Sequence, residues 1–165
     1  MDRETERAAL HKAVASIERT TGVRPQGCYV RYGPSVHTRE LVVEEGGVVY
    51  DSNAYNDDLP YYVEVAGRKW LVVPYSLEVD DTRFWRGGMS RPDDFYETMR
   101  DSFDRLYREG ASRPKMMSVG LHCRIAGRPA RAVALERFLD YAQEHPNVSF
   151  ARCIDIANWW LERNP

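Results

Sequence analysis

The sequence predicts an α/β fold with a largely parallel sheet. Short apolar segments typical of buried strands alternate with longer segments whose apolar residues recur at helical spacing. The chain has 165 residues, of which 43% are hydrophobic, so it can bury a core and is expected to form one domain over residues 1–165. A closed β/α barrel needs roughly 250 residues. We therefore expect either a small open sheet or part of a larger barrel.

The first half of the chain is predicted to contain two helices, two short strands and a hairpin. The segments are a helix over residues 2–21, a strand over 27–31, a helix over 36–45, a strand over 48–50 and hairpin strands over 61–65 and 69–73. Ala13 and Ile17 lie one helical turn apart, and Gly22 is suited to end the first helix. Ser35 is a candidate cap for the second helix.

The second half is predicted to be mainly helical, with two further strands. Residues 83–91 are expected to be irregular, followed by a helix from Pro92 or Asp93 to Gly110, a strand over 116–121, a helix over 130–144, a strand over 147–150 and a helix over 154–161. Pro129 suits the first turn of the helix that follows it. The apolar run of residues 116–121 is typical of a buried strand.

Composition argues against several classes of partner. The chain carries 23 basic and 25 acidic residues, a formal net charge of −2, so no strong electrostatic footprint for nucleic acid or an anionic membrane is predicted. No apolar run reaches the roughly 18 residues that a membrane-spanning helix needs. The first ten residues are polar and lack the apolar core of a secretory leader, so we expect a cytoplasmic protein.

Polar side chains follow four of the predicted strands. In parallel α/β sheets, functional groups collect on the loops after the carboxyl ends of strands. The groups are Tyr29, Arg31 and Tyr32, then Asp51, Asp57 and Asp58, then Asp80 and Asp81, then His122 and Arg124. His122 is the sharpest candidate, because imidazole exchanges protons near neutral pH and can serve as general acid or base. The alternative is a histidine bonded to a backbone carbonyl at a strand end.

The acidic pairs also allow two interpretations. Asp57 and Asp58 are either a coupled carboxylate pair or a turn residue beside a solvated charge, and Asp80 and Asp81 allow the same two interpretations. Neither HxxxH nor HExxH occurs in the sequence. The spacing therefore predicts no metal site and no cofactor.

Two long segments resemble the polysaccharide deacetylase superfamily. They are YDSNAYNDDLPY at residues 50–61 and PKMMSVGLHCRIAGRP at residues 114–129. Between them, VPYSL at residues 73–77 and the Asp80–Asp81 pair resemble the family's central strand and loop. The similarity runs from about residue 6 to the C-terminus. It is strongest to the branch that contains metal-independent allantoinases and cyclic-imidase-like peptidoglycan deacetylases.

The resemblance implies a partial, distorted β/α barrel of the polysaccharide deacetylase type and hydrolysis of a non-peptide carbon–nitrogen bond. Leu121–His122 corresponds to the family's fifth motif, whose histidine is assigned an acid or substrate-orienting role. Asp57 and Asp58 fall in the region of the fourth motif, which orients the site. The third motif usually holds an arginine beside a proline, and this chain departs from it with YVRYGP at residues 29–34.

These correspondences give a set of expected site residues. We expect His122, Asp57 and Asp58 to be catalytic. We expect substrate contacts from Tyr29, Arg31, Asp80, Asp81, Arg124 and Arg128, with the arginines suited to an anionic group. The implied substrate is a small molecule, either an allantoin-like ureide or an N-acetyl sugar.

The family's aspartate-bearing first strand and its histidine motif have no counterpart in this sequence. The chain is therefore expected to hold roughly the last half of the family barrel. Unpaired sheet edges and uncovered apolar surface would then favour a homo-oligomer.

Several functions remain open from the sequence. The first is a hydrolase of the allantoinase type, acting in ureide or purine catabolism. The alternatives are a catalytically inactive remnant or interaction module of the same family, and a sugar N-deacetylase of carbohydrate metabolism. A carbohydrate-binding domain that uses Trp85 and exposed tyrosines is a further hypothesis, based on aromatic content.

Overall fold

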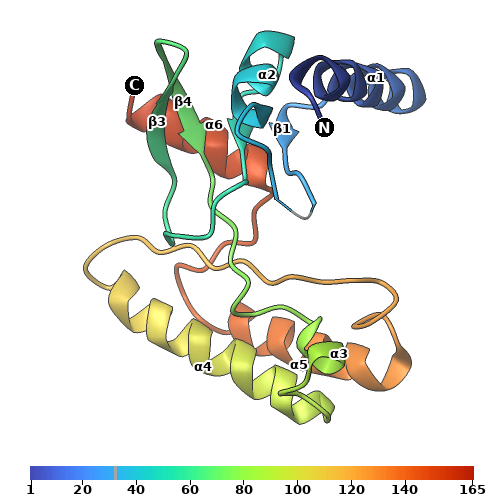
Figure 1. The fold of residues 1–165 in the computed structure, drawn as a ribbon. Coiled ribbons are helices and arrows are strands. Elements are labelled where there is room, and N and C mark those ends of the chain that lie inside the picture. The colour runs from blue at the N-terminus through green and yellow to red at the C-terminus, as the bar shows by residue number, and fades with distance from the viewer. Residues whose placement is uncertain (32) are drawn as a thin grey trace. The chain divides into compact units, whose positions relative to one another are not determined.

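The computed structural model describes residues 1–31 and 33–165 and divides the chain into two compact units (Figure 1). Unit 1 comprises residues 1–75 and 151–165, and unit 2 comprises residues 76–150. The sequence predicts one domain over residues 1–165. Tyr32, which the sequence analysis placed after the first strand, lies outside the described residues.

Unit 1 contains an open sheet of four strands in the order β1-β2-β4-β3. The strands are β1 (Gly27–Cys28), β2 (Tyr50–Asp51), β3 (Tyr61–Val65) and β4 (Arg68–Val72). β1 pairs with β2 and β2 with β4 in parallel, whereas β3 and β4 form the antiparallel hairpin. Ala66 and Gly67 have φ angles of 50° and 73°, as a two-residue type I′ turn requires. The predicted α/β class, the parallel pairing and the hairpin are confirmed.

Three helices accompany this sheet. α1 (Arg3–Thr21) begins at Asp2, whose carboxylate accepts the Thr5 N–H, and ends at Gly22 with a φ of 74°. α2 (Thr38–Glu45) begins two residues later than predicted. The delay is explained by Ser35, whose Oγ accepts the His37 N–H and fixes a turn ahead of the helix. The third helix is α6 (Cys153–Arg163).

The core of unit 1 lies around the sheet, and α6 is tied to the hairpin at its C-terminal end. One cluster of buried apolar residues in this core comprises Val42, Val48, Val65, Trp70 and Val72. The Tyr62 hydroxyl donates to the Asn164 carbonyl at 2.6 Å, and Lys69 Nζ donates to the Pro165 carbonyl at 2.6 Å. Residues far apart in sequence therefore contact one another within one compact unit.

Unit 2 is helical. It contains α3 (Arg83–Arg86), α4 (Pro92–Gly110) and α5 (Pro129–Gln143), and α4 and α5 pack side by side (Figure 1). Their shared core includes Phe95, Met99, Phe103 and Phe138. Pro92 and Pro129 occupy the first turns of α4 and α5, where a missing N–H costs nothing.

Two predicted strands are wrong. Residues 116–121 do not form a strand. Their pairing is limited to one parallel bridge between Asp80 and Gly120. Residues 147–150 are irregular, and Asn147 has a φ of 64°, which is incompatible with extended backbone. Residues 83–86 form the short helix α3 where irregular structure was expected.

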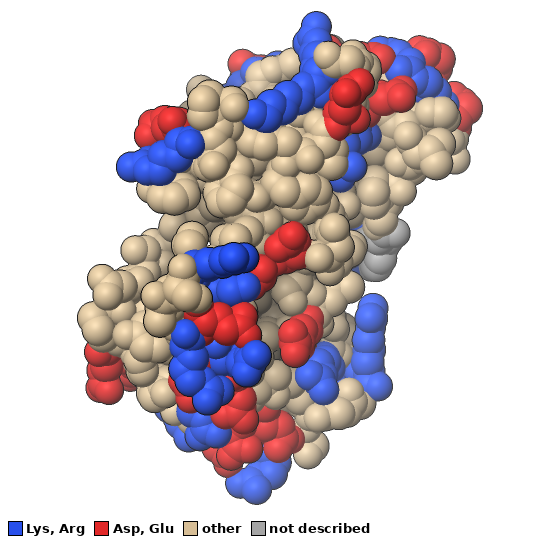
Figure 2. All heavy atoms as spheres, turned by 90° about the vertical axis from the view of Figure 1, so that its left-hand side faces the viewer, with Lys and Arg blue, Asp and Glu red and all other residues tan. Residues whose placement is uncertain are grey.

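Basic and acidic side chains are mixed on the face of the molecule that Figure 2 draws. They lie beside one another over the helices of unit 2. Within the described residues, no helix is both long enough and apolar enough to cross a bilayer.

Candidate functional site

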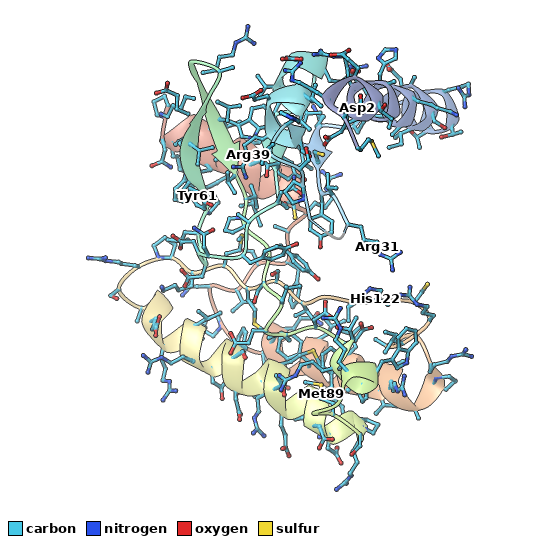
Figure 3. The ribbon with its side chains drawn as sticks, viewed as in Figure 1. Asp2, Arg31, Arg39, Tyr61, Met89 and His122 are labelled. Atoms are coloured by element: carbon cyan, nitrogen blue, oxygen red, sulfur yellow. The ribbon has the colours of Figure 1, made fainter. Side chains whose placement is uncertain are left out.

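A histidine–carboxylate pair forms the most organised polar cluster of unit 2. Nδ1 of His122 lies 2.7 Å from Oδ1 of Asp81, and the His122 backbone N–H donates to Oδ2 of the same carboxylate at 2.7 Å. Asp81 is 0% exposed, whereas 27% of the His122 side chain remains accessible. His122 lies in the loop ahead of α5, as Figure 3 shows. The imidazole is thus fixed from one side and open on the other.

The backbone around Asp81 and His122 builds this pair. The single bridge places the two segments together, with the Asp81 N–H donating to the Gly120 carbonyl at 3.0 Å. A tight turn then follows His122, and the Ala126 N–H returns to Oδ2 of Asp81 at 3.0 Å. Three donors therefore converge on one buried carboxylate, which offsets the cost of removing its charge from water.

The turn after His122 depends on Gly127. A Cβ at this position would lie 2.3 Å from the backbone oxygen of Cys123, which belongs to the same turn. We expect Gly127→Ala to lower the free energy of unfolding by about 1–3 kcal/mol, as overpacking does elsewhere. Chemical denaturation measures the loss. Gly110→Ala is the matched control, since nothing lies within 4 Å of its added Cβ; equal stability of the two variants would contradict the expectation.

The hydrogen bond to Asp81 decides which imidazole nitrogen can meet a ligand. An ionised carboxylate only accepts, so Nδ1 of His122 carries a hydrogen and donates it to Asp81. Nε2 is then the ring atom available for proton transfer or hydrogen bonding. This is the arrangement by which a carboxylate holds a catalytic imidazole in one tautomer.

Asp80 lies next to the pair, and its carboxylate accepts hydrogen bonds within its own turn. Its carboxylate accepts hydrogen bonds from the backbone N–H and the hydroxyl of Thr82. Ligand atoms of Asp80, Asp81 and His122 lie within 4.8 Å of one another, a spacing that can hold a cation. However, both oxygens of Asp81 already accept N–H groups and Nδ1 is bonded to one of them. The cluster therefore fits a histidine–carboxylate pair better than a metal site.

The predicted site residues are distributed over both units. Unit 2 brings Asp80, Asp81 and His122 together, and Tyr29, Arg31, Asp57 and Asp58 belong to unit 1. Asp81, one of the residues expected to contact substrate, is buried, and its carboxylate contacts His122.

Asp57 has the geometry of a turn residue. Its exposed side chain accepts the backbone N–H groups of Asp58 and Leu59 at 2.8 and 3.2 Å. Its local contacts are those of the turn interpretation given above.

The two predicted arginines of unit 2 lie in the segment that follows His122. The Arg124 guanidinium lies over the Trp85 ring, 5.2 Å from its centroid. Arg128 is the residue at which α5 begins. Both are exposed, and stacking on Trp85 restricts the orientations open to Arg124.

Unit 1 contains a second buried charge cluster, of which the sequence indicated Asp51 as a polar residue after a strand but not its partners Arg39 and Trp70. Asp51 is 0% exposed and accepts two hydrogen bonds from the guanidinium of Arg39, at 2.8 and 3.1 Å. Trp70 Nε1 donates to the same carboxylate at 2.6 Å. The hydrogen bonds to Asp51 raise the pKa of Arg39 above its usual value. Asp51 follows an apolar strand in the sequence, but nothing in its local spacing identifies Arg39 and Trp70 as partners.

Comparison with known proteins shows which family the chain belongs to. No family model matches the chain. A curated protein of Schizosaccharomyces pombe named "Putative polysaccharide deacetylase" is 36% identical, over 98% of this chain and 56% of its own length. A solved structure of a "probable Polysaccharide deacetylase" from Pseudomonas aeruginosa PAO1 is 47% identical with a TM-score of 0.93, covering 100% of this chain and 56% of that one.

A structure described as PuuE allantoinase is equally similar. It is 47% identical with a TM-score of 0.94, and the match covers 100% of this chain and 55% of the allantoinase. The chain thus spans little more than half the length of these relatives. The two structural matches cover 100% of this chain. The chain belongs to the polysaccharide deacetylase family.

Proposed function

We propose that this chain supplies the acid–base histidine of a hydrolase that opens a non-peptide carbon–nitrogen bond, most similar in activity to an allantoinase. The observation that carries the proposal is the His122–Asp81 pair, in which a fully buried carboxylate fixes Nδ1 at 2.7 Å and leaves Nε2 for the substrate. Such a pair suits proton transfer, since the carboxylate orients the ring and stabilises its protonated form.

The proposed step assigns one proton to His122. In amide or ureide hydrolysis, the oxygen of water bonds to the carbonyl carbon and the C–N bond breaks. Nε2 of His122 takes the proton that the attacking water releases, and the protonated imidazole then gives this proton to the leaving nitrogen. Asp81 is a positioning residue in this scheme, because it acts through His122. Arg124 is proposed to contact an anionic group of the substrate or product from its place on Trp85.

The proposal also includes a choice between two substrate classes, an allantoin-like ureide and an N-acetyl sugar. The allantoinase and the Pseudomonas protein are each 47% identical to this chain, so identity supports an allantoin-like ureide and an N-acetyl sugar equally. We propose the ureide first, because the two quoted segments resemble the allantoinase branch most closely. Purified chain assayed with allantoin and with N-acetylglucosamine oligomers tests this choice. Faster release of acetate than ureide opening would reverse it, and turnover of neither would support the inactive remnant.

Asp81→Asn tests the positioning role. An asparagine amide can donate to Nδ1, which favours the tautomer with hydrogen on Nε2 and removes the negative partner of the protonated ring. We expect a fall in kcat of about 10²–10⁴ with a smaller change in KM. Nitrogen-15 spectra of the His122 ring report the tautomer directly. Unchanged ring shifts together with unchanged kcat would contradict the assignment.

We further propose that the open sheet is part of a distorted barrel. β1 and β3 are the edge strands of the sheet, and exposed edges are templates for pairing with another chain. Sedimentation velocity is expected to show self-association of this chain. A monodisperse monomer at all concentrations tested would contradict it.

A further inference from the structure

Arginines gather around the short helix α3 of unit 2, with no carboxylate among them in the sequence. The segments of residues 82–92 and 122–135 contain six arginines and no aspartate, glutamate or lysine. All 25 acidic residues of the chain lie outside these two segments. The formal net charge of −2 therefore hides a local surplus of positive charge. Figure 1 shows α3 beside the start of α5, where the second segment ends.

Two of these arginines are stacked on neighbouring aromatic rings of α3. The Arg131 guanidinium lies over the Phe84 ring, 4.6 Å from its centroid, and the Arg124 guanidinium lies over the Trp85 ring, 5.2 Å from its centroid. The two segments are therefore in contact. Stacking uses the face of a guanidinium and leaves its N–H edge available, and this planar edge matches the two oxygens of a carboxylate.

The chain itself leaves most of this positive charge without a partner. Arg91 pairs with Asp93 at 2.7 Å, and Arg83 donates to a backbone carbonyl, that of Glu78, at 3.4 Å. α5 has no acidic residue in its first turn, so the partial positive charge of its N-terminus adds to that of the side chains. Among the described residues, no ion pair is formed by Arg83, Arg86, Arg124, Arg128 or Arg131.

An exposed tryptophan lies among these arginines. Trp85 is 57% exposed, whereas Phe84 packs against the helical core of unit 2. We call Trp85 and the five arginines without ion pairs the arginine surface. Tryptophan and arginine are enriched among the residues that dominate the binding energy of protein interfaces. Binding of single-stranded nucleic acid uses successive aromatic platforms along a basic groove, whereas this surface has one exposed ring.

We propose that the arginine surface binds an acidic segment of another protein that carries an apolar side chain between its carboxylates. Trp85 contacts the apolar side chain, and the guanidinium edges bond to the carboxylates. Binding relieves the mutual repulsion of the five like charges. No bond is made or broken, and neither His122 nor turnover is needed, so this proposal and the hydrolase proposal can fail separately. Arg124 is shared between them, and the variants below leave it in place.

Calorimetry on the full chain tests the surface with three probes. The first is a hexapeptide of five glutamates around one leucine, the second has glycine in place of the leucine, and the third is a single-stranded oligothymidylate of equal charge. We expect saturable binding of the leucine peptide, weaker binding of the glycine peptide, and weaker binding of both as the salt concentration rises. No saturable binding of the leucine peptide, or tighter binding of the oligothymidylate, would overturn the proposal.

Two double variants separate the arginine surface from the net charge of the chain. Arg86→Gln with Arg131→Gln should weaken binding of the leucine peptide about tenfold, as two exposed ion pairs lost together would. Arg108→Gln with Arg113→Gln is the matched control, because it removes the same charge from two exposed arginines outside both segments. Equal losses of affinity in the two double variants would show a general charge effect and would contradict a defined surface.

Trp85→Ala tests the apolar part of the surface. We expect this variant to lose the preference for the leucine peptide over the glycine peptide. Trp159→Ala on α6 is the matched control, since Trp159 is 46% exposed and also carries a guanidinium, that of Arg163, 4.6 Å from its ring centroid. The control should bind both peptides as the parent chain does. A leucine preference that persists in Trp85→Ala would show that the indole does not recognise the partner, and the proposal would be wrong.

Discussion

Replacing His122 by asparagine is expected to lower kcat for hydrolysis of the preferred substrate by about 10²–10⁴, the usual contribution of a positioned acid–base group. Asparagine is the sharpest replacement, because its amide can still donate to Oδ1 of Asp81 where Nδ1 does now. The buried carboxylate then keeps a partner and the turn up to Ala126 should be preserved. Only the proton transfer through Nε2 is lost. Steady-state kinetics on the ureide or N-acetyl substrate measure the effect.

His11→Asn is the matched control for this variant. His11 lies on α1 with 72% of its side chain exposed and faces Glu45 at 3.2 Å, so its loss should leave kcat unchanged. The free energy of unfolding of both variants should stay close to that of the parent chain. If His122→Asn retained full activity while folded, the histidine would be structural and the hydrolase mechanism proposed above would be wrong.

The largest expected loss of stability follows from removing Asp51. In Asp51→Ala, the Arg39 guanidinium and Trp70 Nε1 lose their shared partner inside the sheet region of unit 1. Breaking a buried ion pair by removing one member typically costs about 3–5 kcal/mol, because the remaining charge is left uncompensated. We expect a fall of this size in the free energy of unfolding, measured by urea denaturation of the full chain.

A double-mutant cycle measures the coupling free energy between Arg39 and Asp51 separately from the effect of lost packing. Asp51→Leu with Arg39→Met removes both charges and keeps apolar volume, so the double variant should be less destabilised than the sum of the single changes. Asp57→Ala is the surface control, since Asp57 is exposed and bonds within its own turn. Additive losses in the cycle would show that Arg39 and Asp51 stabilise the unit independently.

Local patterns were enough to predict most of the helices and the hairpin. α1, α4 and α5 follow from apolar spacing and from Gly22, Pro92 and Pro129 at their ends. These signals act over one or two turns of chain, so a single sequence contains them. Residues 116–121 show the limit of such signals. Their apolar run is equally compatible with a strand and with an irregular segment beside a helical core, and pairing partners decide between the two.

The candidate site could be predicted only in part for the same reason. His122 is recognisable from its position after an apolar segment, but Asp81 precedes it by 41 residues. The sequence shows that both residue types are present, whereas the bridge at Gly120 determines that they meet. Asp57 shows the reverse case, because its turn contacts depend on the two residues that follow it and were within reach of local reasoning.

The return of α6 to unit 1 has a consequence for how the chain folds during synthesis. Residues 76–150 emerge from the ribosome as one continuous segment and can form unit 2 while translation continues. The contacts of Tyr62 and Lys69 with Asn164 and Pro165 form only after those two residues have also been synthesised. The hairpin can thus form early, and its contacts with residues 164 and 165 are among the last that translation allows.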